Sequence, residues 1–200
     1  MTLHTNNSCY WWEEAPPSSA PAMDWSDKTD IAIIGCGFTG LSAALTLARA
    51  GREVVVLEKN LIGEGASTRN GGITSGNIRL SQKQLTRRFG PERAQTFIDE
   101  SVAARADLER FIIENKIDCD YQAVGRIVGL TGSFSSKTIE RDHNEFANRY
   151  NIEPRLISKA EMAEYTNSKK YGAGILRKDI GGIHPAKLLH EMVRLALDAG

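Results

Sequence analysis

Cysteine is scarce in this sequence. Cys9, Cys36 and Cys119 are odd in number and widely spaced, and no two of them form a Cys-x-x-Cys pair. A dense disulfide framework would need more cysteines, and a zinc site would need them closer together. The pattern therefore favours reduced thiols and predicts no metal centre.

Long apolar runs are also absent. No stretch approaches the ~18 apolar residues that a membrane helix needs. The first residues, Met-Thr-Leu-His-Thr-Asn-Asn, lack the basic start and the apolar segment of a secretory signal. We expect a soluble, cytoplasmic protein with no membrane partner.

Neither sign of charge is in excess. The chain has 25 basic and 25 acidic residues, and no basic cluster is longer than a few residues. This balance gives no electrostatic basis for binding nucleic acid. With 200 residues, 41% of them hydrophobic, the chain is large enough for the core of one or two domains.

The pattern of residues 29–59 predicts a strand, a glycine turn, a helix and a second strand. Residues 30–34 are largely apolar and β-branched, and the glycine turn 35–40 follows them directly. Apolar residues then recur at helical spacing as far as Gly51, and a second apolar run occupies 54–57. Both strands are predicted to be buried.

The glycine turn has the Gly-x-Gly-x-x-Gly spacing of dinucleotide-binding folds. Gly35 permits the tight turn, Gly37 lets the backbone approach a pyrophosphate, and Gly40 lets the helix pack close to the sheet. The helix N-terminus favours phosphate. Glu58 ends the second strand about 20 residues later, where a carboxylate can accept hydrogen bonds from ribose hydroxyls. These residues leave open whether the ligand is a nicotinamide or a flavin dinucleotide.

A second glycine-rich segment, residues 61–72, comes next. Small residues precede Arg69 and Asn70, and two glycines follow them. This pattern suits backbone that runs beside a bulky planar ligand, with Ser67, Arg69 and Asn70 as donors to phosphate or ring oxygens. A mobile surface loop is the alternative.

An arm precedes the first strand. Tyr10, Trp11 and Trp12 form an aromatic cluster, and residues 15–22 are rich in proline, serine and alanine without periodicity. The second stretch predicts an extended linker. We expect the aromatic rings to anchor the arm onto the folded body; a binding role for the tryptophans is the alternative.

Helices and short strands follow residue 90 in an irregular order. Periodicity and capping patterns predict helices over 91–115, 135–150, 158–165 and from 185, and strands over 121–130, 155–157 and 172–177. The buried side chains are expected to be Ala94, Phe97, Ile98, Val102, Leu108, Phe111, Ile112, Ile127, Val128, Ile139, Phe146, Ala147, Tyr150, Leu188, Leu189, Met192, Val193 and Ala196. His143 lies in a run of charge and is expected to be exposed.

The later strands lack a regular βαβ rhythm, so they predict a mixed or antiparallel layer inserted into the nucleotide domain. We expect an arm and linker over 1–28, the first part of the nucleotide domain over 29–90, helices and the start of a substrate domain over 91–180, and a helix that returns to the nucleotide domain over 181–200. A strand should follow that helix. A sheet edge and apolar surface are therefore expected to be uncovered.

Five segments, in order, carry a family resemblance. They are Ser8-Cys9-Tyr10-Trp11-Trp12, the glycine turn with the residues up to Ala44, Gly65-Ala66-Ser67-Thr68-Arg69-Asn70-Gly71-Gly72, Ile117-Asp118-Cys119-Asp120-Tyr121 and Gly182-Ile183-His184-Pro185. With them the chain resembles the D-amino-acid oxidase or glycine oxidase superfamily of FAD-dependent oxidoreductases, in particular its γ-glutamylputrescine oxidase-like group. The resemblance implies an α/β fold, with a Rossmann-like FAD-binding domain and an inserted mixed-sheet substrate domain, whose C-terminal half is missing here.

The resemblance also implies FAD rather than NAD. The implied cofactor-binding residues are Gly35, Cys36, Gly37, Phe38, Thr39, Gly40, Glu58, Lys59, Ala66, Ser67, Arg69, Asn70, Gly71, Gly72 and Ile73. The implied reaction oxidises a primary or secondary amine, such as γ-glutamylputrescine or an amino acid, by hydride transfer to the flavin. Water hydrolyses the resulting imine, and oxygen or another electron acceptor reoxidises the flavin.

No catalytic residue is assigned from the sequence. His184 precedes Pro185 at a helix start, where it either caps the helix or contacts substrate. Two other functions stay open. An NAD-dependent dehydrogenase would share the stretch from Gly35 to Glu58, and a truncated, non-catalytic FAD-binding chain would need its missing half or another chain.

Overall fold

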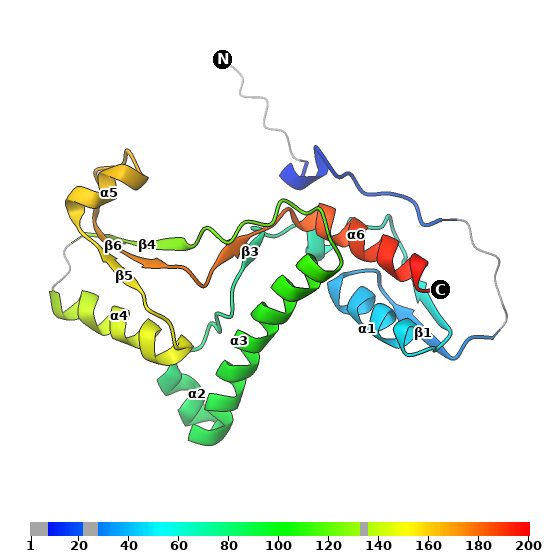
Figure 1. Ribbon diagram of the computed structural model, residues 1–200, viewed down its shortest axis with the longest axis horizontal. Helices are drawn as coiled ribbons and strands as arrows, with labels where there is room; N and C mark the ends of the chain where they lie inside the picture. Colours follow the sequence, from blue (N-terminus) through cyan, green and yellow to red (C-terminus); the bar gives the residue numbers. More distant parts are fainter. Residues whose placement is uncertain (1–7, 22–27, 133–135) are drawn as a thin grey trace, which may run out of the picture. The chain divides into compact units, whose positions relative to one another are not determined.

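The computed structural model describes residues 8–21, 28–132 and 136–200. The start of the arm, the end of the proline-rich stretch and Ser135 lie outside the described residues. The chain divides into two compact units. The first consists of the residues up to Gly72 with Lys116–Tyr121 and Ile183–Gly200, and the second of Ile73–Asn115 and Gln122–Gly182 (Figure 1).

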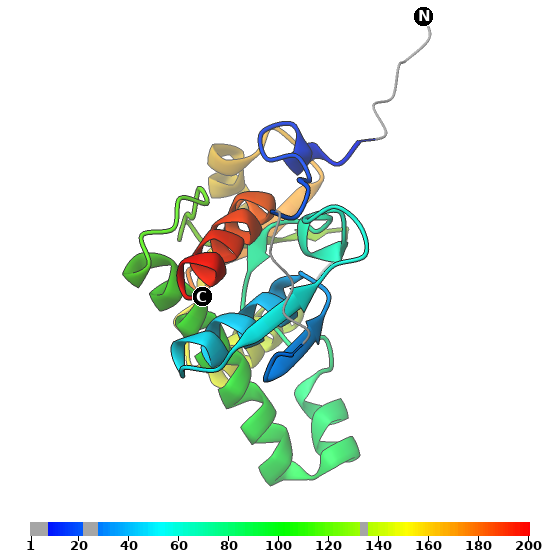
Figure 2. The ribbon, with the colours of Figure 1, turned by 90° about the vertical axis from the view of Figure 1, so that its right-hand side faces the viewer.

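The first unit contains the predicted strand, turn, helix and strand. These are β1 (Ile31–Ile34), α1 (Phe38–Arg49) and β2 (Val54–Leu57), and β1 pairs with β2 in parallel. Helix α6 (Pro185–Asp198) packs alongside α1, as Figure 2 shows. The buried apolar side chains of these two helices include Leu41, Ala44, Leu45, Leu188, Leu189 and Met192.

The prediction that both strands are buried is wrong. Among the described residues β1 and β2 form a sheet of two strands. Side chains along β1 alternate between half-buried and exposed, Ile34 is 81% exposed, and all of β2 is half-buried. An apolar run shows that a strand can be buried. The strand is buried only when other elements pack on both faces of its sheet. The exposed Ile34 instead agrees with the expected uncovered apolar surface.

The second unit combines helices with an antiparallel sheet. Its helices are α2 (Gln82–Phe89), α3 (Pro91–Glu114), α4 (Ser136–Tyr150) and α5 (Lys159–Tyr165). Its three-stranded sheet has the order β4-β6-β5, formed by Arg126–Thr131, Tyr171–Arg177 and Arg155–Ile157. A core cluster contains Leu85, Ala94, Ile98 and Tyr150.

The second unit also contains a short two-stranded ribbon. The two-residue strands β3 (Ile73–Thr74) and β7 (Gly181–Gly182) pair antiparallel. Gln122 forms an isolated bridge with Gly182, so the first half of the strand expected over 121–130 is a single bridge. Gly125, between this bridge and β4, has a φ of +83°, a conformation that favours glycine.

Arg177, at the end of β6, is only 1% exposed although it is charged. Its guanidinium donates to the Asp179 carboxylate through Nε at 3.0 Å and to Asn77 Oδ1 through Nη1 at 2.8 Å. The rings of Phe146 and Tyr150 lie 4.7 and 4.5 Å from it. A fully paired guanidinium of this kind fixes the end of the central strand.

Two predictions about side-chain exposure in this unit need correction. Phe97 and Val102 were expected on the buried side of α3 but are 40% and 38% exposed. Phe97 packs edge-on against Phe89 of α2, with ring centroids 5.0 Å apart, and part of its ring stays exposed. Val102 lies further along α3, which has 24 residues whereas α2 has only 8. His143 is half-buried rather than exposed, and its Nε2 lies 2.8 Å from the Pro154 carbonyl oxygen.

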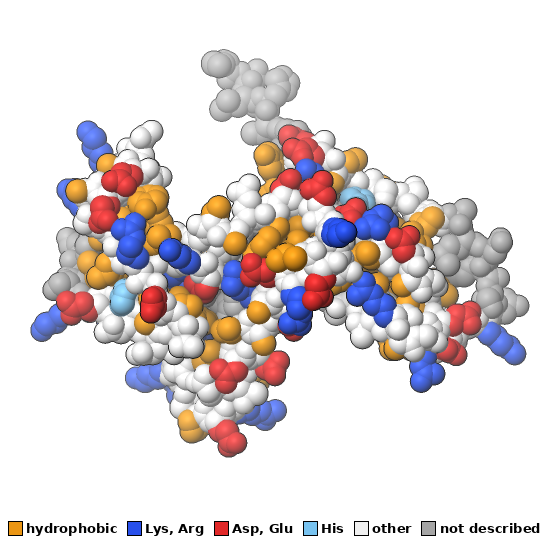
Figure 3. All heavy atoms as spheres, in the orientation of Figure 1, with side chains coloured by type: hydrophobic (Ala, Val, Ile, Leu, Met, Phe, Trp, Pro, Cys, Tyr) orange, Lys and Arg blue, Asp and Glu red, His pale blue; other side chains and the backbone are white. Residues whose placement is uncertain are grey.

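Charged and apolar side chains are interspersed on the face drawn in Figure 3. No helix in the described parts of the chain is both long enough and apolar enough to cross a membrane.

Candidate cofactor site

The glycine turn connects β1 to α1 by a sharp change of direction. Gly35 has a φ of +99° and donates its N–H to the Leu57 carbonyl at 2.8 Å, so the turn is tied to the end of β2. Gly37 is the N-cap of α1 and supplies no side-chain oxygen. The first turn of α1 therefore keeps N–H groups that can face an anion.

Two of the glycines are required by close approaches. A Cβ on Gly40 would collide with the Gly35 carbonyl, and a Cβ on Gly37 would lie 2.9 Å from Ser67 Oγ. These contacts fit a cradle of backbone against which a pyrophosphate can lie.

Glu58 binds the turn directly. Its Oε2 accepts the Cys36 N–H at 2.8 Å, and its Oε1 accepts the N–H groups of Lys59 and Asn60 at 2.9 and 3.2 Å. The Cys36 hydrogen bond is the largest cause that lowers the pKa of this carboxyl below its ordinary value. Glu58 is thus an ionised group held at the end of β2.

The second glycine loop, residues 61–72, is braced by its own side chains. Asn70 Oδ1 accepts the Gly72 N–H at 2.9 Å, and Asn70 Nδ2 donates to the Ser67 carbonyl at 2.7 Å. Thr68 is fully buried and donates its hydroxyl to the Gly63 carbonyl. Ser67 Oγ accepts the N–H of Phe38 at 3.1 Å. The two glycine segments therefore meet at the start of α1.

The structure brings most of the sequence-predicted residues together. The turn, Glu58 and Ser67 are joined by hydrogen bonds. The exposed members of the predicted set are Thr39, Lys59, Ala66, Arg69, Asn70, Gly71 and Ile73, while Cys36 and Gly72 are buried. Ile73 begins the second unit, in β3. Contact of these residues with FAD stays a prediction.

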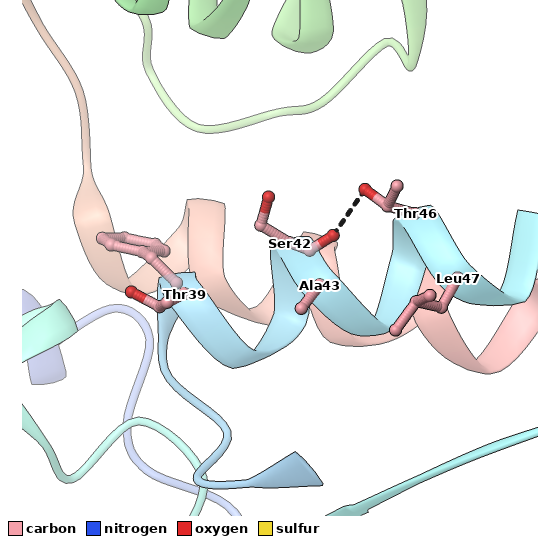
Figure 4. A pocket seen from close by; sticks show the side chains of 6 residues that line it. Thr39, Ser42, Ala43, Thr46 and Leu47 are labelled. Carbon is pink, nitrogen blue, oxygen red and sulfur yellow. Dashed lines mark hydrogen bonds between the residues drawn. The ribbon is translucent and has the colours of Figure 1, made fainter. Parts of the chain in front are cut away.

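An open hollow of about 580 Å³ lies against α1 (Figure 4). Its lining consists of Phe38, Thr39, Ser42, Ala43, Thr46 and Leu47, and the Thr46 hydroxyl donates to the Ser42 carbonyl at 2.8 Å. Only Phe38 and Thr39 belong to the predicted site. The hollow adjoins the candidate site without containing Glu58 or the second glycine loop.

His184 takes the capping role that the sequence left open. It is buried, and its Nδ1 accepts the Lys187 N–H at 3.2 Å as the N-cap of α6. Within the described parts of the chain, His, Cys, Asp and Glu side chains form no group that could hold a metal ion.

The predicted set omits Thr68, whose buried hydroxyl supports the second glycine loop. The signal available was its position inside the Gly-Ala-Ser-Thr-Arg-Asn-Gly-Gly segment, but nothing in the pattern distinguishes a buried hydroxyl from an exposed one. The expected anchoring of the aromatic arm is confirmed, since Trp11 and Trp12 both donate their indole N–H to this loop.

Comparison with known proteins gives a consistent result. The model of a family described as FAD-dependent oxidoreductase, DAO, matches residues 30–200. A probable oxidoreductase, OrdL, of Rhizobium meliloti (strain 1021) is 34% identical, over 95% of this chain and 45% of the relative. The γ-glutamylputrescine oxidoreductase of Escherichia coli (strain K12) is 30% identical, over 94% and 44%.

Solved structures agree in fold. Glycine oxidase from Bacillus cereus ATCC 14579 superposes with a TM-score of 0.65 at 21% identity, over 86% of this chain and 45% of that one. The chain thus spans a little under half the length of the relatives it matches.

Proposed function

The chain belongs to the DAO family of FAD-dependent oxidoreductases, and from this premise we propose that it is the FAD-binding part of an enzyme that oxidises an amine or an amino acid. The predicted family, the Rossmann-like fold and FAD as the cofactor are confirmed by the family match and the fold likeness. The site residues and the reaction are the proposal.

One observation carries the assignment of the site. Glu58, the glycine turn and Ser67 form a hydrogen-bonded set around the start of α1. In the proposal Glu58 binds the adenosine ribose, residues 35–40 and the N-terminus of α1 bind the pyrophosphate, and residues 66–73 run beside the pyrophosphate and flavin. The glycine contacts described above fit such a ligand.

FAD, when bound, supplies the two-electron acceptor for oxidation of an amine to an imine, which water hydrolyses to a carbonyl compound. The residues of this chain bind and orient the cofactor and offset its phosphate charge. The names of the similar proteins, γ-glutamylputrescine oxidoreductase and glycine oxidase, support an amine substrate. We propose oxygen or another electron acceptor as the second substrate, and the cytoplasm as the location.

A second candidate is a chain that binds FAD but turns over only with a partner that completes it. The exposed β1, with Ile34 81% exposed, favours this candidate. An NAD-dependent dehydrogenase is disfavoured, because the matching family is described by FAD.

Ligand protection tests the assignment. FAD should raise the thermal unfolding midpoint of the chain, and NAD⁺ at the same concentration should not, because a ligand stabilises only the protein that binds it. Anaerobic addition of glycine or γ-glutamylputrescine to the FAD-loaded chain should bleach the flavin if the substrate pocket is present. Protection by NAD⁺ alone would overturn the proposal, whereas FAD protection without bleaching would select the second candidate.

A further inference from the structure

The N-terminal arm, residues 8–21, forms several hydrogen bonds to the second glycine loop. Trp12 Nε1 donates to Thr68 Oγ1 at 3.0 Å, and Trp11 Nε1 donates to the Asn70 carbonyl at 2.7 Å. The Cys9 thiol donates to the Thr68 carbonyl at 3.2 Å. Since the Thr68 hydroxyl also donates to the loop itself, both of its hydrogen-bonding roles are filled.

The arm is also held on α6 and on the start of the loop. The Trp11 ring lies 4.9 Å from the imidazole of His184, in an edge-on arrangement. Glu14 pairs with Lys187 at 2.7 Å. Further along, Ser18 exchanges two backbone hydrogen bonds with Ile62, at 3.0 and 2.8 Å. The arm in Figure 2, drawn in dark blue, passes over α6 and this loop.

The burial of the loop is one-sided. Thr68 and Gly72 are buried, and a Cβ on Gly72 would collide with the Ile183 carbonyl and lie 3.1 Å from the Trp11 ring. Ala66, Arg69 and Gly71 are exposed. The arm therefore contacts the buried Thr68 and Gly72 together with the exposed Asn70.

The arm also contacts Arg69, a side chain that we propose to bind the ligand. Its guanidinium lies 4.5 Å from the centroid of the Trp12 ring, in a cation–π contact. A long, exposed side chain held in this way loses less conformational freedom when it binds an anion or a ring carbonyl.

We propose that the N-terminal arm is a positioning element of the cofactor site: Trp11 and Trp12 hold the second glycine loop and Arg69 in the conformation that receives the flavin half of FAD. This inference rests on the proposed function of residues 66–73. The hydrogen bonds that hold Glu58 and the glycine turn run to each other, to Ser67 and to the end of β2. Binding of the adenosine half should therefore depend much less on the arm.

The test compares FAD with ADP on three variants. Trp12→Phe keeps an aromatic ring but removes the indole N–H, and Trp11→Phe does the same for the second hydrogen bond. Tyr10→Phe is the matched control, because Tyr10 is 70% exposed. Dissociation constants for FAD and for ADP, and amide hydrogen exchange of residues 65–72 without ligand, are measured for each variant.

The expected result is a split between the ligands. Either tryptophan variant should weaken the affinity for FAD about three- to tenfold, the effect of one net hydrogen bond. The affinity for ADP should fall clearly less, because ADP meets the loop only through its pyrophosphate. Amides of the loop should exchange faster, and Tyr10→Phe should match the unchanged chain. The inference would be overturned if the affinities for FAD and ADP fell equally. It would also be overturned if the FAD affinity and the hydrogen exchange of the loop stayed unchanged. If the unchanged chain binds no FAD, the proposed function fails and the exchange data alone decide whether the arm orders the loop.

Discussion

At the scale of the residue, the site depends on glycines that other atoms approach closely and on a carboxylate that binds backbone. Gly37 faces Ser67 Oγ, and Glu58 holds the N–H groups of Cys36, Lys59 and Asn60. A small side-chain change at either position alters the shape of the cradle more than it alters the core. Binding and stability should therefore separate in variants.

Gly37→Val should abolish measurable FAD binding or weaken it by at least about tenfold, because a branched side chain fills the space that the pyrophosphate needs. The thermal midpoint of the free chain should fall only slightly, because Ser67 Oγ, the atom that the new side chain meets, can rotate away. Ser42→Val adds similar bulk on the exposed side of α1 and is the control for helix effects. Isothermal titration with FAD measures both, and equal affinities would place the pyrophosphate elsewhere.

Glu58→Ala should weaken ADP binding and also speed hydrogen exchange at Cys36, since it removes the acceptor of that N–H. Glu58→Gln keeps one acceptor oxygen and should show a smaller effect on exchange. Because the pKa of Glu58 is lowered in the folded protein, its contribution persists as the pH falls below the ordinary glutamate range and is lost only through the folded pKa. The ratio of the ADP affinities of the unchanged chain and of Glu58→Ala should accordingly stay constant between neutral pH and about pH 5. This ratio cancels the protonation of the ADP phosphate, and its decline over that range would contradict the assignment.

Cys36 and Cys119 should be unreactive thiols. Burial, the largest cause, raises the pKa of each from 9.0 to about 11. The thiolate fraction near pH 8 is then roughly 100-fold lower than in an unfolded chain. Alkylation followed by peptide mass spectrometry should show slow labelling of both that rises with pH, and fast labelling in denaturant. Rapid labelling of Cys36 in the folded protein would show that the turn opens.

At the scale of the element, local signals and tertiary context contributed differently. The turn, α1, the end of α1 before Gly51 and the Ser158–Glu161 capping box all follow from neighbouring residues, and the structure confirms them. Burial of β1 does not, because it depends on what packs against the strand. Helix α2 has a capping box at Ser81 and Gln84, but apart from Leu85 and Phe89 its residues are polar, so hydrophobic periodicity gives little signal there. The two-residue strands β3 and β7 carry no periodic signal.

Arg177 shows the same limit and supports a prediction. From the sequence it is one more charged residue at a strand end, yet it is buried among Asp179, Asn77 and two aromatic rings. Arg177→Met should lower the free energy of unfolding of the second unit by about 3–5 kcal/mol, because it leaves buried polar groups unpaired. Arg177→Lys should recover part of the loss. Urea unfolding measures both, and a loss below about 1 kcal/mol for the methionine variant would mean that the cluster is solvated.

At the scale of the whole molecule, the chain folds into two units and spans a little under half of its relatives. The apolar end of β1 is exposed because the described residues supply no third strand to its sheet. An uncovered strand edge with an apolar side chain promotes association.

Ile34→Thr should therefore reduce concentration-dependent self-association while leaving the unfolding midpoint nearly unchanged, because threonine keeps strand propensity. Ile33→Thr, at the neighbouring half-buried position, is the control and should lower the midpoint. Sedimentation velocity over a concentration series measures association. Identical behaviour of the two variants would show that β1 is covered in solution.

The central claim is that the glycine turn, Glu58 and the second glycine loop together form an FAD site. The most direct measurement is the visible absorption spectrum of FAD after dialysis against the chain, with Gly37→Val treated in parallel. The account predicts retention of about one FAD per chain with a perturbed spectrum, displacement by excess ADP, and no retention by Gly37→Val. Free passage of FAD past both proteins, or equal retention by both, would contradict it.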